Sequence, residues 1–245
     1  MLGANYLITG GTSSGSAGHY TFARTEEATN QYAQITFQTT KKIKRIVINK
    51  RTDNQAYSDK IYGCFLSISV DGATKYNRVI SIADRPDAAN LNRLEFSFTD
   101  ATIKLSNKAS EYINLNSILV YDGADNEVSA FGKPSMSSVY QDRLDLGPEN
   151  IISKRTEPIG NGQMAHTKDG VSEWMQIDFP YIRTVSRVII NNRNDDWGRR
   201  IVGCTLQITV GGADVEIHVF TQAEYDVSYH SGNRHKTLTV NVGED

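Results

Sequence analysis

The residues best suited to chemistry gather in one short stretch of the chain. Two arginines, two aspartates and a tryptophan follow one another there: Arg193, Asp195, Asp196, Trp197 and Arg200. Guanidinium groups offer several N–H donors in a planar fork, and an indole ring offers an apolar platform. Aspartates beside arginines keep their charged form, which opposes general-acid catalysis. These residue types therefore favour a site that binds a ligand over a site that transforms one.

Catalytic motifs do not offer a stronger interpretation. The sequence contains no His-Glu-x-x-His motif for a catalytic zinc. The Gly/Ser-rich residues 10–15 carry no lysine, and no predicted helix follows them, so they indicate a flexible turn rather than a phosphate-binding loop. We therefore predict that the protein is not an enzyme.

An internal repeat organises the chain. Three segments recur in the same order with many identities: residues 32–37 match 174–179, residues 45–53 match 187–195, and residues 61–70 match 201–210. The spacing changes only in the loop before the third segment, where insertions are best tolerated. The sequence therefore predicts a tandem duplication of one domain type.

The apolar residues within each copy follow the period of a β-strand. Leu206, Ile208 and Val210 alternate with polar neighbours, as half-buried strands do. Cys64 and Cys204 lie on the apolar side of equivalent strands, which predicts two buried thiols rather than a disulfide or a zinc site. The predicted fold class is all-β, with two tandem antiparallel jelly-roll-like β-sandwiches. We place them at residues 1–125 and 126–245, and expect the second to lack its last strand and to offer an open edge to a partner chain.

The repeated segments are similar to a known family. Residues 173–179, 188–195 and 200–204 resemble the discoidin-like, galactose-binding fold of coagulation-factor C-type domains, and more narrowly the F-type lectins, or fucolectins. Residues 131–138 resemble the opening of such domains, and residues 115–121 resemble their closing strand. The resemblance covers both copies and implies a galactose-binding-domain-like fold that binds carbohydrate.

The resemblance also implies a site in the second copy. The family motif is a histidine followed by two arginines ahead of an Ile/Leu-x-Gly strand, and the second copy keeps that order. The implied site for fucose- or galactose-type glycans consists of His166, Arg193, Asp195, Trp197 and Arg200. The vicinal cysteines of the family are absent, and Trp197 could replace their apolar surface. A pyranose presents vicinal hydroxyls and an apolar face, which suit a fork of donors and an aromatic platform. A solvated cluster of ion pairs is the alternative interpretation of the arginines and aspartates.

The first copy carries a weaker version of this site. Its counterparts are His19, Arg51, Asp53, Tyr57 and Lys60. Lys60 stands where the second copy has Arg200, and an ammonium group cannot reproduce the planar fork of a guanidinium. Arg51 and Asp53 also fit an internal salt bridge. We therefore expect the first site to be weak or silent.

Structural calcium is the cofactor that the resemblance implies. F-type lectins hold calcium with loop oxygens near the start of the domain and a glutamate on the closing strand. The carbonyl-rich residues 142–150 supply the candidate ligands Asp142, Asp145 and Asn150. The glutamate is missing, because residues 116–118 read Asn-Ser-Ile.

The composition excludes several classes of function. Lys plus Arg is 26 and Asp plus Glu is 28, so the net charge of −2 lacks the basic footprint of a general nucleic-acid or anionic-membrane binder. No apolar run is long enough to cross a bilayer, and the N-terminus lacks the layout of a secretory signal, which predicts cytoplasmic synthesis. The expected partners are a glycan or glycoprotein and further protein chains, in a homo-oligomer or a larger assembly.

Two other functions stay open from the sequence. A structural or attachment component of a virion, tail or surface fibre fits the missing signal and the departures from the lectin motif. Binding of a lipid headgroup fits less well, because only Trp197 and Tyr57 are available as exposed apolar spikes.

Overall fold

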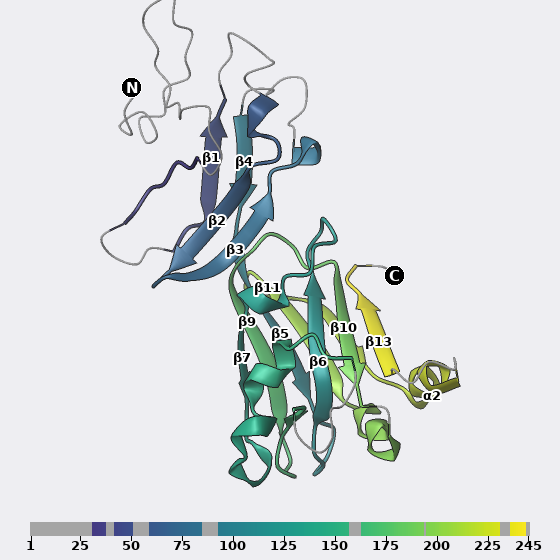
Figure 1. The fold of residues 1–245 in the computed structure, drawn as a ribbon. Helices are drawn as coiled ribbons and strands as arrows, with labels where there is room; N and C mark the ends of the chain where they lie inside the picture. Colours follow the sequence, from purple (N-terminus) through teal and green to yellow (C-terminus); the bar gives the residue numbers. More distant parts are fainter. Residues whose placement is uncertain are drawn as a thin grey trace, which may run out of the picture. The chain divides into compact units, whose positions relative to one another are not determined.

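The computed structural model divides the chain into two compact units, Met1–Phe98 and Thr99–Asp245 (Figure 1). It describes residues 31–37, 42–50, 59–84, 93–156, 163–193, 195–230 and 236–243. The two units are built mainly from antiparallel strands, as the predicted all-β class requires. Within these ranges, no helix is long and apolar enough to span a membrane.

The second unit contains a five-stranded and a four-stranded antiparallel sheet (Figure 1). The five-stranded sheet has the order β12 (Ala213–Val219), β11 (Thr205–Val210), β5 (Thr99–Ser106), β9 (Trp174–Ile182) and β7 (Lys133–Met136). The four-stranded sheet has the order β13 (Lys236–Asn241), β10 (Arg187–Asn192), β6 (Asn114–Tyr121) and β8 (Ala165–His166). Among the described residues of this unit, one α-helix, α2 (Gln222–His230), follows β12. Short 3-10 helices occupy the connections: η4 (Ser129–Phe131), η5 (Tyr140–Asp142), η6 (Leu144–Leu146), η7 (Pro148–Ile152) and η8 (Asp196–Ile201).

The two sheets of the second unit share one core. Ile103 and Leu105 on β5 and Ile118 and Val120 on β6 are fully buried, and all four belong to one hydrophobic cluster. Polar residues separate them along β5, because successive side chains of a strand point to opposite faces. The arrangement is that of a β-sandwich, in which the inward faces of both sheets form the core.

The first unit contains two smaller sheets. β1 (Arg45–Asn49) pairs with β4 (Arg93–Ser97), and β2 (Phe65–Val70) pairs with β3 (Ala73–Val79). The 3-10 helices η2 (Asp59–Ile61) and η3 (Ile82–Asp84) flank the second hairpin. Buried side chains include Leu94 and Phe96 on β4, and Tyr76, whose ring meets that of Phe98 edge to face.

The two units contain equivalent strand pairs with the same register. In β1–β4, Ile48 faces Leu94, and in β10–β13, Ile190 faces Leu238. The β2–β3 hairpin has a register shift after Ile68, and β11–β12 has the corresponding shift after Ile208. Such a match of register and bulge shows that the sequence repeat is also a structural repeat.

A glycine turn precedes both the β2–β3 hairpin and the β11–β12 hairpin. Gly63 and Gly203 adopt φ angles of 93° and 85°, a left-handed conformation that disfavours other residues. Their backbone N–H groups donate to Ile80 and Phe220 at 2.8 and 2.7 Å, which closes both hairpins in the same way.

The division between the units differs from the boundary expected between residues 125 and 126. The repeat assigns β5 and β6 to the first copy, whereas the structure places both in the sheets of the second unit. There β6 pairs with β10 and β5 pairs with β11, so the second unit does not lack the strands that it was expected to lack. We call β5 and β6 the closing strands.

The two cysteines differ in burial, although they are equivalent in the repeat. Cys204 is buried, as expected, whereas Cys64 is exposed, contrary to the expectation from the apolar side of its strand. Burial raises the pKa of the Cys204 thiol to about 12, and the nearby carboxylate of Glu111 adds to the effect. Glu111 lies in the connection between the closing strands.

This difference predicts selective thiol chemistry. At mildly alkaline pH, Cys64 should react readily with a thiol reagent, whereas Cys204 should react only in denaturant. Mass spectrometry of the labelled peptides measures the two rates separately. Equal rates in the folded protein would contradict the assigned burial.

A second prediction concerns Gly132, just before β7. A Cβ atom at this position would lie 2.2 Å from Cγ2 of Ile177 and 3.0 Å from the ring of Phe179. Gly132→Ala should therefore lower the free energy of unfolding by about 1–3 kcal/mol through overpacking. Urea unfolding measures the change, and an unchanged midpoint would contradict this contact.

Candidate ligand-binding site

The predicted site residues of the second unit meet at one end of the four-stranded sheet. Asn114, at the start of β6, pairs with His166 of β8, and Leu115 pairs with Asn192 at the end of β10. Arg193 follows β10 directly, and Arg200 lies on η8 (Asp196–Ile201). The strand register thus brings together residues that are distant in the sequence.

Arg193 and Asp195 form a bidentate ion pair. Nε of Arg193 donates to Oδ1 of Asp195 at 2.6 Å, and Nη2 donates to the second carboxylate oxygen. Burial alone would raise the pKa of Asp195, but the hydrogen bond and charge of Arg193 outweigh it, so the pKa is lowered. The charged carboxylate then caps η8 by accepting the backbone N–H of Trp197 at 3.2 Å. Of the ion-pair cluster given as the alternative, the structure shows this one pair within the described residues, and the Arg193 side chain is largely buried in it.

The loop around this ion pair is tightly packed. The amide of Asn192 donates to the carbonyl of Gly198 at 2.7 Å. A Cβ atom at Gly198 would lie 2.4 Å from the carbonyl oxygen of Arg193, so only glycine fits. Arg193 and Asp195 consequently position the start of η8, and with it Trp197 and Arg200.

Arg200 lies against two aromatic rings. Its guanidinium carbon is 4.3 Å from the ring centroid of Trp197 and 4.7 Å from that of Tyr112. These are favourable cation–π distances. Trp197 is 53% exposed, so the indole remains available to solvent and to a ligand.

Two tyrosines that the sequence did not single out complete the cluster. The imidazole of His166 lies 5.3 Å from the ring of Tyr112 and 4.5 Å from that of Tyr140, between ring centroids. Tyr112 and Tyr140 meet each other edge to face at 5.7 Å. Tyr112 lies in a connection and Tyr140 begins a short 3-10 helix, so no periodic pattern marks either residue, and only their aromatic character could have drawn attention to them. We call His166, Tyr112, Tyr140, Trp197 and Arg200 the aromatic–arginine cluster.

The environment of His166 keeps its imidazole neutral. Burial, followed by the positive charges of Arg193, Arg200 and Arg143, lowers its pKa from 6.5 to about 4. Its Nε2 atom is buried and has no hydrogen-bond partner among the side chains and backbone that the structure describes. A buried polar atom without a partner is unusual and often marks a functional site.

The candidate calcium ligands do not form an evident ligand set. Asp142 pairs with Lys168 at 2.7 Å, and Asp145 pairs with Arg143 at 2.5 Å. Asn150 uses its amide nitrogen to hold the carbonyl of Asp145 at 2.8 Å. In the described ranges, no group of three His, Cys, Asp or Glu residues is suited to a metal ion. The residues present therefore do not fit the calcium site implied by the resemblance.

The candidate site of the first copy falls mostly outside the described residues. His19, Arg51, Asp53 and Tyr57 all lie there. Lys60 is described and exposed on η2. Its carbonyl accepts from the thiol of Cys64 at 3.5 Å, as that of Arg200 accepts from Cys204 at 3.3 Å. This confirms the equivalence of Lys60 and Arg200 along the backbone.

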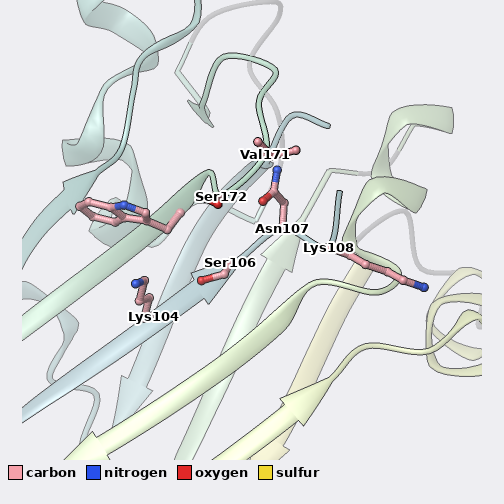
Figure 2. A pocket seen from close by; sticks show the side chains of 7 residues that line it. Lys104, Ser106, Asn107, Lys108, Val171 and Ser172 are labelled. Carbon is pink, nitrogen blue, oxygen red and sulfur yellow. The ribbon is translucent and has the colours of Figure 1, made fainter. Parts of the chain in front are cut away.

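A separate depression lies on the five-stranded sheet and the loops beside it (Figure 2). Its volume is about 550 Å³. The lining contains none of the predicted site residues and consists of Lys104, Ser106, Asn107, Lys108, Val171, Ser172 and Trp174. The Asn107 amide nitrogen donates to the carbonyls of Ala109, Glu111 and Gly170 at 2.6 to 2.8 Å. Asn107 thus joins two loops, which explains its place there without a ligand.

Comparison with known proteins gives no assignment of family or function. No family model, curated protein or solved structure matches the chain.

The His166 environment predicts an unusual titration. We expect its pKa to be about 4, whereas the unfolded chain binds the same proton near 6.5. Protonation then favours the unfolded state, so this contribution to stability is present above pH 6.5 and is lost as the pH falls towards 4. NMR titration of the histidine ring protons, with His166→Gln to assign the signal, measures the value. Replacing Arg193 by glutamine should raise it, and an ordinary pKa in the wild type would contradict the assigned environment.

Proposed function

We propose that the protein is a non-catalytic, lectin-like carbohydrate-binding module that recognises fucose- or galactose-type glycans. In this proposal both units belong to the discoidin-like, jelly-roll class, closest to the F-type lectins, and the aromatic–arginine cluster of the second unit contacts the sugar. The proposal is supported by the sequence resemblance and by the way the cluster combines charge, aromatic surface and exposure.

The proposal rests mainly on how the guanidinium of Arg200 is held. Its guanidinium stacks on Tyr112 and Trp197, and no hydrogen bond or ion pair to it is found within the described ranges. The side chain is half-buried, so the stacked group is held in place and still reaches solvent. A planar, pre-positioned fork of donors is suited to two neighbouring hydroxyl groups of a sugar.

The other members of the cluster take distinct roles. Trp197 supplies an exposed apolar platform for the C–H face of a pyranose. His166 is neutral and therefore adds no charge repulsion beside the arginines. Arg193 is occupied by Asp195, so it positions the loop rather than forming the main sugar contact.

Glycan-array binding of the full chain tests the proposal. Arg200→Ala should lower the affinity for the preferred glycan at least tenfold, since one or two charge-assisted hydrogen bonds are lost. Arg200→Lys should lose most of this affinity as well, because the charge remains but the planar fork does not.

Arg199→Ala is the matched control. Arg199 is the exposed neighbour of Arg200 on η8, and its loss removes the same charge from the same helix. Glycan affinity should stay within about twofold in this variant, because surface charges act weakly on neighbours. No binding of the wild type to any glycan, or equal losses in both alanine variants, would contradict the proposal.

A second candidate function is that of a structural or attachment component of a larger assembly. It is favoured by the first unit, where Val47, Phe65 and Val79 are exposed on strands. Apolar strands that face solvent commonly mark protein contacts. Both functions gain from association of several chains, because multivalency strengthens weak single contacts.

A further inference from the structure

We propose that the first unit is an acceptor for two consecutive strands of a partner polypeptide. One strand would add to the edge of β1 opposite β4 and the other to the edge of β2 opposite β3, as β6 and β5 add to β10 and β11 in the second unit. The expected partner segment has the chemistry of the closing strands: two short strands with branched apolar residues at alternate positions, joined by a polar connection.

The second unit shows what such strands do. Ile118 of β6 faces Ile190 of β10, and Leu105 of β5 faces Leu206 of β11. These four side chains are fully buried. Each closing strand therefore pairs with the edge of β10 or β11 and adds its own apolar side chains to the shared core.

The described part of the first unit contains the equivalent strand pairs without a third strand beside them. Among the described residues, β1 pairs with β4 alone and β2 pairs with β3 alone. Ile48 and Leu66, the counterparts of Ile190 and Leu206, are only half-buried. Phe65, next to Leu66, is 69% exposed. The edge and the apolar residues beside it are thus accessible together.

The connection between the closing strands lies against the turn at Gly203 and Cys204. The side chain of Lys108 packs so close to Gly203 that a Cβ atom there would lie 2.7 Å from it. Glu111 lies near enough to Cys204 to raise the pKa of its thiol. At the equivalent turn of the first unit, Cys64 is exposed. A partner that adds both strands should enclose Cys64 in the same manner.

The shared register argues for strands as the occupant. The strand pair β1–β4 matches β10–β13 residue for residue. The hairpin β2–β3 matches β11–β12 in the same way, including the bulge after Ile68 and Ile208. An open strand edge presents unpaired N–H and C=O groups, which another strand satisfies along its whole length. Within the described residues, β5 and β6 are already paired in the second unit, and we therefore assign the edges of β1 and β2 to a further segment of this kind.

A peptide with the sequence of residues 99–121 is the probe. It is added to the full-length protein, and alkylation of Cys64 and Cys204 is followed by mass spectrometry. At saturating peptide, Cys64 should react at least tenfold more slowly, while Cys204 remains unreactive. A peptide in which the residues corresponding to Ile103 and Leu105 are replaced by aspartate is the control and should give no protection.

Fusing a second copy of residues 99–121 to the N-terminus through a flexible Gly/Ser linker raises the local concentration of the probe. Cys64 should then be protected without added peptide, and glycan binding should be unchanged, because the aromatic–arginine cluster is not involved. Unprotected Cys64 in both experiments would overturn the proposal. Exposure of Cys204 would also overturn it, since it would show that the probe displaces the closing strands instead of occupying the first unit.

Discussion

The pairing of β5 with β11 and of β6 with β10 is the interaction on which the rest of the structure depends. β5 lies between β11 and β9, and β6 lies between β10 and β8, so each is an interior strand of its sheet. Removing them would divide both sheets and expose the core around Ile103 and Ile118. In the described part of the first unit, strand pairs of the same register have no such strands beside them, and Ile48 and Leu66 are less buried than their counterparts.

The candidate site depends on the same strands. Tyr112 precedes β6, and the start of β6 holds His166 through its pairing with β8. The end of β10, next to β6, leads into the loop in which Arg193 and Asp195 position η8. The stacking of Arg200 therefore combines one group placed by a closing strand with another placed by the loop after β10. A binding site assembled in this way needs the complete sandwich.

Much of this organisation can be predicted from the sequence, because the repeat and the strand period depend on local residue patterns. The burial of Cys204 follows from such a pattern, and the approach of His166 to the two arginines is what the family resemblance implies. The allocation of β5 and β6 cannot be predicted in this way, since an open edge accepts any strand of matching register, whatever its place in the chain. Tyr112 and Tyr140 carry no periodic signal and emerge only from packing.

Hydrogen–deuterium exchange of the full-length protein tests the central claim, that β5 and β6 close the second unit and not the first. Amide protection reports the free energy of opening for each strand. The account predicts that β5, β6, β10 and β11 exchange slowly and together, whereas β1 and β2 exchange at least tenfold faster. Slow exchange of β1 and β2 together with β5 and β6, combined with fast exchange of β10 and β11, would contradict it.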